Sequence, residues 1–205
     1  MRIKKYLKSR CGKVKDLVDG SSVDLLFVFE SPHTDELKNK IPVSGKAGID
    51  SLKFLMQDSS NQISFGRYLK TLHDKNDYRV AVINVSRVPL QNKTFKGKDK
   101  CPSLSSDDWA ILYKIRKSKA KTFKDPKIEK VSKFILKNFK KRIKSIKFST
   151  DSTVVLAGVC AQTFWEKSKI IHSSVLKVTH PSRGQWRDGN PKLEKLPILF
   201  KKATT

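Results

Sequence analysis

The sequence is short of cysteine and of long apolar runs. It has three cysteines (Cys11, Cys101 and Cys160), an odd number with no C-x-x-C pair. This argues against a disulfide framework and against a structural zinc or iron–sulfur site. No apolar run approaches the roughly 18 residues of a membrane-spanning helix, and the basic N-terminus lacks the apolar stretch of a signal peptide. We expect a cytoplasmic protein with no membrane association, no metal and no cofactor.

Acidic residues are also scarce. The chain has 19 Asp and Glu against 44 Lys and Arg, a formal net charge of +25. Such a surface attracts polyanions, and nucleic acid is the default partner. An AT-rich genome inflates lysine everywhere, but codon bias alone does not explain an excess of this size. We therefore expect DNA to be the partner.

The apolar pattern predicts one domain over residues 1–205, with a basic, partly helical lead-in at 1–20. Continuous apolar runs predict buried strands. In most of the segments between these strands the apolar residues recur at helical spacing, and residues 86–102 are predicted to form an irregular loop. Strands alternating with helices predict an α/β fold, a three-layer α/β/α sandwich around a mainly parallel four-stranded sheet. The expected strands are 23–29, 79–85, 153–156 and 175–179, and the expected helices are 49–56, 65–72, one from 105 or 106, a long one from 126, and 161–166.

Polar segments follow three of the expected strands. Residues 29–33 (F-E-S-P-H) and 42–48 (P-V-S-G-K-A-G) follow the first strand, Asn84 ends the second, and 180–182 (H-P-S) follow the fourth. In open α/β sheets, ligands bind outside the carboxyl ends of the strands. These segments therefore predict an active site at that edge of the sheet.

Taken in order, the segments resemble motifs of the uracil-DNA glycosylase superfamily. The closest branch is bacterial and archaeal, with G-E-A-P-G followed by G-x-P-F-V-G-x-A-G, where residues 29–48 here read F-E-S-P-H-T-D-E-L-K-N-K-I-P-V-S-G-K-A-G. The family's strand ending in Asn is similar to 81–85, its L-G-x-x-A to 157–161 and its H-P-S to 180–182. The resemblance runs from residue 23 to about 186. It implies a monomeric, monofunctional DNA glycosylase that flips a pyrimidine nucleotide and hydrolyses its N-glycosidic bond, leaving an abasic site.

Two residues carry the chemistry that the resemblance implies. Breaking an N-glycosidic bond leaves negative charge on the departing base, and His180 would donate a hydrogen bond to a pyrimidine carbonyl oxygen as that charge develops. Asn84 offers both a donor and an acceptor to a base edge. The alternatives are an ordinary loop histidine before proline and an asparagine that caps the adjoining loop.

Departures from the family concern the water and the base. Ser31 stands where the family has Asp or Asn and the closest branch has Ala, and serine is no general base by itself. Water would then be held by Ser31 and backbone only, or Glu30, Asp35 or Glu36 would assist instead, although a solvated surface role is favoured for Asp35 and Glu36. Val43 stands where the closest branch has a phenylalanine that stacks on uracil. Without that ring, about 1–3 kcal/mol of stacking energy is lost.

The small side chains of Val43 and Ser44 open the expected base pocket. The base would be uracil or a larger, hydroxymethylated or glucosylated pyrimidine, the latter excised in antiphage defence. His33 is a further base contact or a structural residue. Ser31 and Val43 also favour the alternative, a catalytically inactive protein of the same fold that binds DNA or a modified base.

The remaining predicted contacts are with DNA. Gly-rich turns let backbone amides approach phosphate, which favours Gly45, Gly48 and Ser182, with Lys46 adding charge. The alternative for the glycines is a plain strand-to-helix turn. The family's leucine wedge is replaced by Arg183-Gly184-Gln185-Trp186. Arg183 or Gln185 would fill the gap left by the flipped nucleotide, and Trp186 either stacks nearby or anchors the loop to the core.

Overall fold

A computed structural model of the chain describes residues 2–19, 22–95, 104–187 and 189–205. Its helices and strands, in chain order, are α1 (Arg2–Lys8), β1 (Val23–Phe29), α2 (Thr34–Asn39), α3 (Lys46–Met56), α4 (Phe65–Asp74), β2 (Val80–Asn84), η1 (Asn92–Phe95), α5 (Ser106–Lys117), α6 (Pro126–Lys144), β3 (Phe148–Ala157), α7 (Val159–Ser168), β4 (Ser174–Val178), η2 (Ser182–Gly184) and α8 (Lys195–Thr204).

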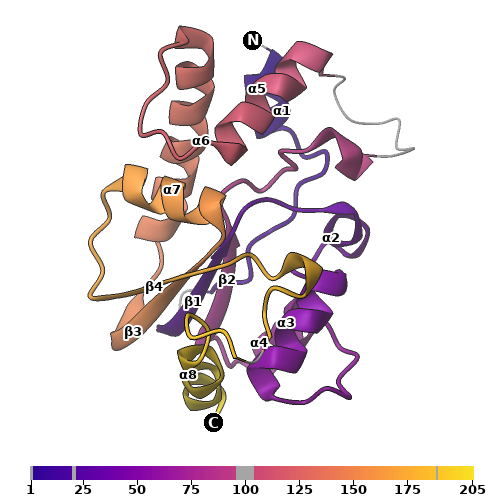
Figure 1. Cartoon of the computed structure of the whole chain (residues 1–205), viewed down its shortest axis with the longest axis vertical. Helices are drawn as coiled ribbons and strands as arrows, with labels where there is room; N and C mark the ends of the chain where they lie inside the picture. Colours follow the sequence, from indigo (N-terminus) through magenta and orange to yellow (C-terminus); the bar gives the residue numbers. More distant parts are fainter. Residues whose placement is uncertain (1, 20–21, 96–103, 188) are drawn as a thin grey trace.

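The four strands form one parallel sheet in the order β2-β1-β3-β4 (Figure 1). Every residue of β2 is buried, as is almost all of β1. A strand covered on both faces has no polar side, and this explains the continuous apolar runs that predicted these strands. The predicted three-layer α/β/α sandwich is confirmed.

Each face of the sheet has its own helical layer (Figure 1). One face packs against α1, α5, α6 and α7 through fully buried side chains such as Tyr6, Phe139 and Phe164. The opposite face packs against α3, α4 and α8, through side chains such as Leu52 and Phe65. We call the second face the α3 face, because the candidate site lies at its edge.

The N-terminal lead-in belongs to the core. Ile3 and Tyr6 of α1 are fully buried, and the Tyr6 hydroxyl donates to the carbonyl oxygen of Pro89 at 2.7 Å. Desolvation strongly raises the pKa of Tyr6. Helix α1 therefore contributes to the packing of the domain.

Helix starts that the sequence predicted are confirmed by their caps. The Ser105 side chain accepts from the backbone N–H of Asp108 at 3.2 Å, and Asp125 caps α6 just before Pro126. Helices α2 and α8 were not predicted. Helix α2 has six residues, too few to show a helical period.

Two absences predicted from composition have different outcomes. Within the described residues, no helix is long and apolar enough to cross a membrane. Cys160 is buried with a free thiol, whereas Cys11 is disulfide-bonded, a bond that the cysteine count had not suggested.

Candidate functional site

The candidate site lies at the carboxyl edge of the α3 face. Phe29, at the end of β1, pairs in register with Asn84, at the end of β2, and Ala157 of β3 pairs with Val178 of β4. Phe29, Ala157 and Val178 all belong to the apolar cluster of the α3 face, and so does Val82. Because side chains alternate along a strand, Asn84 points to the same face as Val82.

His180 reaches this edge from the loop after β4. Its ring meets the Phe29 ring edge-on, with 6.2 Å between centroids. Gly158 makes room for it: a Cβ at position 158 would lie 3.0 Å from the His180 Cβ, and the φ of +88° there also favours glycine. Asn84 and His180 therefore flank Phe29, and we call Phe29, Asn84, Gly158 and His180 the edge site.

Hydrogen bonding sets the tautomer of His180. The backbone N–H of Ser182 donates to His180 Nδ1 at 3.2 Å, and the Ser182 hydroxyl lies 3.0 Å from the same nitrogen. Since Nδ1 accepts, the proton of the neutral ring is on Nε2. Desolvation lowers the pKa of His180 below 6.5, against an opposing effect of Glu30. At neutral pH, His180 is a neutral donor through Nε2.

Asn84 has an unsatisfied acceptor. The residue is 2% exposed, and its Oδ1 finds no hydrogen-bond partner within the described part of the chain. Burial raises the pKa of Glu36, and the Asn84 side chain acts against that rise. A buried carbonyl oxygen without a donor is costly and unusual in a native fold. A bound water or a ligand group would have to supply the missing donor.

Glu36 lies in the candidate site, although the sequence favoured a solvated surface role for it. Its Oε1 accepts from the backbone N–H of Val43 at 2.7 Å, and its Oε2 accepts from the backbone N–H of His33, also at 2.7 Å. Burial raises the pKa of Glu36 to about 7. The solvated surface role expected for this residue is therefore wrong. The spacing of His33 and Glu36 at the start of a helix, a capping-box pattern, was a signal for this contact.

The turn at Val43 is locked in a strained conformation. Val43 has a φ of +53°, which a β-branched residue rarely adopts. Its carbonyl oxygen accepts from the N–H of Gly66 at 3.1 Å, and a Cβ at Gly48 would lie 1.9 Å from that same oxygen. Gly48 is thus required for close packing of α3 on the turn. Its own N–H donates to the Gly45 carbonyl at 2.8 Å, so it is not free for phosphate.

Three other predicted residues are occupied within this loop. The Ser44 hydroxyl donates to the Ile41 carbonyl at 2.8 Å and accepts from Asn39 at 3.1 Å. Gly45 precedes the first turn of α3, where a Cβ would lie 2.7 Å from Asp35 Oδ2. His33 is exposed at the start of α2, and desolvation lowers its pKa.

The predicted water-holding residues have partners of their own. Glu30 Oε1 accepts from Arg116 Nε at 2.6 Å and from Gln91 Nε2 at 3.3 Å. The Ser31 hydroxyl accepts from the backbone N–H of Leu90 at 3.3 Å and lies 3.5 Å from Glu30 Oε1. Arg116 lies on α5, far away in sequence, and was not predicted.

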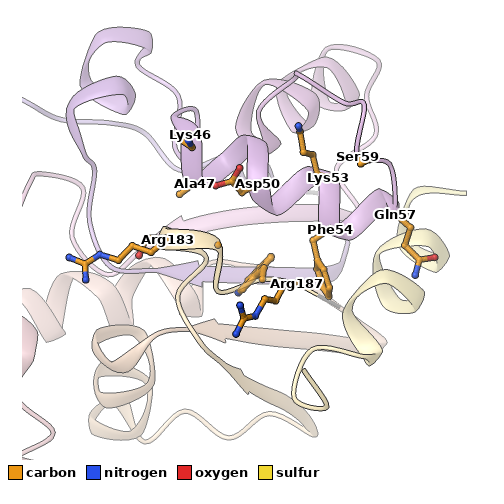
Figure 2. Close-up of a pocket in the computed structure, with 12 residues that line it drawn as sticks. Lys46, Ala47, Asp50, Lys53, Phe54, Gln57, Ser59, Arg183 and Arg187 are labelled. Atoms are coloured by element: carbon orange, nitrogen blue, oxygen red, sulfur yellow. The ribbon is translucent and has the colours of Figure 1, made fainter. Parts of the chain in front are cut away.

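A basic groove of about 1020 Å³ adjoins the edge site. Helix α3 and the residues after it form one wall, and the segment that follows His180 forms the other (Figure 2). Neither Asn84 nor His180 lines the groove. The groove is lined by Lys46, Ala47, Asp50, Lys53, Phe54, Gln57, Ser59, Ser182, Arg183, Gly184, Trp186 and Arg187.

Trp186 joins the groove to the edge site. It is 4% exposed, its Nε1 donates to the Thr179 carbonyl at 2.8 Å, and its ring packs on Phe27, Phe29 and Phe54. Of the two interpretations of Trp186, the structure supports the one in which it anchors the loop to the core.

The exposed residues beside Trp186 are available for ligand contact. Arg183 and Gln185 are exposed, and Arg183 has a left-handed φ of +62°. In Figure 2 the Arg183 side chain extends past the carboxyl ends of the strands. The backbone N–H of Ser182, predicted to bind phosphate, instead donates to His180.

Comparison with known proteins adds no relative: no protein-family model matches the chain, and no curated protein matches it. Within the described residues, no group of three or more His, Cys, Asp and Glu side chains is placed to hold a metal ion. The function is therefore inferred from the geometry of the site.

Proposed function

We propose that the protein is a monofunctional DNA glycosylase that flips a pyrimidine nucleotide and hydrolyses its N-glycosidic bond. The observation that carries this proposal is the pairing of Asn84 and His180 on either side of Phe29, one with an unsatisfied acceptor and the other with a neutral N–H donor. A nucleobase edge combines acceptors and donors in just this way. The motif resemblance to the uracil-DNA glycosylase superfamily independently names the same two residues.

The role of His180 follows from its tautomer. As the glycosidic bond breaks, charge develops on a carbonyl oxygen of the base, and a donor already aimed at that oxygen stabilises the transition state. Ser182 holds the ring through Nδ1, so Nε2–H needs no reorganisation. Removing one such donor typically costs about 10²–10³ in rate.

Glu30 would act on the sugar. Its carboxylate, ion-paired with Arg116, is close enough to shift the pKa of His180. Negative charge at this position stabilises an oxocarbenium-like sugar electrostatically. We assign Glu30 this role, and Ser31 the role of orienting Glu30 and the attacking water.

The basic groove supports DNA as the substrate. Four basic side chains and one acidic side chain, that of Asp50, line the groove. The basic residues are Lys46, Lys53, Arg183 and Arg187. Lysine and arginine side chains bind phosphate and release counterions, the main source of affinity for DNA. A base buried in a duplex must be flipped before it reaches such an edge. We propose that Arg183 and Gln185 fill the gap that the flipped nucleotide leaves in the duplex.

The base would be uracil or a larger pyrimidine. Val43, which is less bulky than phenylalanine, packs against the edge-site face. We infer that hydroxymethylated or glucosylated pyrimidines are accommodated, which suits a monomeric, cytoplasmic enzyme of antiphage defence.

One observation favours a second candidate, an inactive protein that binds DNA or a modified base. The Ser31 hydroxyl and Glu30 Oε1 both have partners, and each is needed to orient water in the enzyme. The two candidates share the fold and the groove, so DNA affinity alone does not separate them.

A single-turnover assay for abasic sites separates them. Duplexes containing uracil, 5-hydroxymethylcytosine or its glucosylated form are incubated with excess protein and probed for alkali-labile sites. The enzyme predicts abasic sites with wild type, and a severe loss with Asn84→Ala and His180→Ala at unchanged DNA affinity. Equal affinity in all three proteins with no abasic site on any duplex would support the inactive binder.

A further inference from the structure

A second pocket lies on the other side of the sheet from the edge site. It has a volume of about 220 Å³, and it is formed by α1 with the loop after it, by α6 and by the segment that follows β2. The proposed reaction uses none of its residues. We call it the α6 pocket, and it is lined by Leu7, Lys8, Ser9, Lys13, Val85, Ser86, Arg87, Val88, Phe134, Ile135 and Asn138.

A buried carboxylate fixes one wall of the α6 pocket. The Asp16 side chain is 2% exposed, and its Oδ2 accepts from Arg87 Nε at 2.9 Å and from Arg87 Nη2 at 2.7 Å. Arg142 Nη1 donates to the same carboxylate at 3.0 Å. Two guanidinium groups share one carboxylate, so the network keeps a net positive charge. Arg87 is thus held in place, while its Nη1 forms no hydrogen bond within the described part of the chain.

Arg142 also sets the orientation of Asn138. Its Nε donates to Asn138 Oδ1 at 2.9 Å. Because a guanidinium donates and never accepts, Asn138 must present its oxygen to Arg142, and the NH₂ group of the same amide is turned away. Asn138 is exposed and lines the pocket. A second oriented donor, this one uncharged, is therefore available to a ligand.

Two lysines add charge to the pocket. Lys8 and Lys13 are exposed, and neither forms an ion pair among the described residues. Lys8 Nζ lies 5.8 Å from the centroid of the Phe134 ring. No acidic side chain of the described residues lines the pocket. Its ammonium, guanidinium and amide groups present only hydrogen-bond donors, which is the complement of an oxyanion.

We propose that the α6 pocket binds a phosphate monoester. A phosphate monoester carries about −1.5 to −2 charges at pH 7 and three acceptor oxygens, so it matches several donors at once. The phosphate would lie on Arg87, Asn138 and the two lysines. The adjoining organic group would lie on the apolar wall formed by Phe134 and Ile135.

The volume limits how much of the ligand is enclosed. Pockets that bury most of a drug-sized ligand have about 300–1,000 Å³, whereas the α6 pocket has about 220 Å³. It therefore encloses the phosphate and the group next to it, and leaves the rest of the ligand outside. A phosphate joined to a deoxyribose has this form, either in a free nucleotide or at the 5′ end of a DNA strand.

Asn138→Asp is the variant that tests the pocket with least disturbance. It keeps an oxygen for Arg142 and replaces the NH₂ donor with a negatively charged oxygen that repels phosphate. The matched control is Lys137→Gln, which lowers the net charge by the same amount at an exposed neighbouring position outside the pocket lining. An unchanged amide spectrum away from the pocket shows that each variant is folded.

Binding is measured by calorimetry with deoxythymidine 5′-monophosphate, thymidine and inorganic phosphate. We expect the nucleotide to bind more tightly than phosphate, and thymidine not to bind. Asn138→Asp should weaken nucleotide binding at least about tenfold, Lys8→Gln about fivefold, and Lys137→Gln less than about twofold. In ¹⁵N-labelled wild type, the nucleotide should shift amide signals of residues 85–88 and 134–138.

Three results would overturn the proposal. These are no binding of the nucleotide, an equal loss in Asn138→Asp and Lys137→Gln, and binding that His180→Ala weakens but Asn138→Asp does not. The last result would place the nucleotide at the edge site.

The source of the phosphate is identified with two single-stranded oligonucleotides that differ only in a 5′-phosphate. A gain in affinity from the 5′-phosphate in wild type that Asn138→Asp abolishes would support the pocket with a strand end as its occupant. No such gain, with binding of the mononucleotide retained, would support the pocket with a free nucleotide as its occupant. These measurements do not involve base release, so the α6 pocket is tested separately from the proposed function.

Discussion

Replacing His180 with alanine is the perturbation whose effect the structure defines best. The substitution removes a neutral Nε2–H donor that Ser182 has already oriented, with its backbone N–H 3.2 Å from Nδ1. A preorganised donor of this kind contributes about 3–4 kcal/mol to the transition state. We expect the single-turnover rate of base release to fall by about 10²–10³ at pH 7.5.

The matched control is Ser182→Ala. It removes the hydroxyl, which lies 3.0 Å from His180 Nδ1, and keeps the backbone N–H that sets the tautomer. We expect its rate to remain within about threefold of wild type, because the net contribution of one such hydrogen bond is at most about 1 kcal/mol.

DNA affinity is measured in parallel by fluorescence anisotropy. It should be unchanged in both variants, because an interaction made only in the transition state lowers the rate and leaves ground-state binding intact. A His180→Ala protein within threefold of the wild-type rate, or a loss seen only in affinity, would refute this role for His180.

Three further predictions concern stability and DNA binding. Gly48→Ala should lower the free energy of unfolding by about 3 kcal/mol in urea titrations, because its Cβ would lie 1.9 Å from a backbone oxygen that cannot easily move. Glu36 has a pKa raised from 4.5 to about 7 in the folded protein, so its stabilising contribution is present below pH 4.5 and lost as pH rises through 7. Relative to Glu36→Gln, wild type should lose roughly 3 kcal/mol of unfolding free energy over that interval. Replacing Lys46 and Arg183 with glutamine should reduce the slope of log affinity for duplex DNA against log salt by about 2.

Each of these predictions has a control. Gly189→Ala has open space around its Cβ and a φ of +77°, so backbone strain alone should cost it about 1 kcal/mol. An equal loss at both glycines would contradict the packing role of Gly48. A difference between wild type and Glu36→Gln that does not vary with pH would contradict the raised pKa.

The control for DNA binding lies on the opposite layer. Lys137 and Lys141 are exposed on α6, on the far side of the sheet from the basic groove. Their replacement with glutamine should change the salt dependence less than the loss of Lys46 and Arg183. Equal effects of the two pairs would show that the groove is not the main DNA contact.

The fold was predictable because its strands are parallel and buried. Such strands are continuous apolar runs, and parallel strands place their carboxyl ends at one edge, where Asn84 and His180 do lie. Periodicity also located α5 and α6, whose caps are visible in the sequence. The start of α3 at Lys46, three residues before the predicted start, depends on packing against the Val43 turn.

The parts of the site that were not predicted depend on contacts between distant segments. Glu36 is enclosed because the Val43 turn folds back over it, and Arg116 reaches Glu30, in the loop after β1, from helix α5. Motif positions alone also misplace backbone donors. The motifs predicted that the backbone N–H groups of Gly48 and Ser182 bind phosphate. In the fold these groups donate instead to the Gly45 carbonyl and to His180 Nδ1.

Mass spectrometry of the free bases released from DNA tests the central claim most directly. Natural and phage DNAs, including genomes with hydroxymethylated and glucosylated pyrimidines, are incubated with wild type or Asn84→Ala, and the small-molecule fraction is analysed. We predict one free pyrimidine species with wild type and none above background with Asn84→Ala. Tight DNA binding with no base released from any of these DNAs would contradict the account.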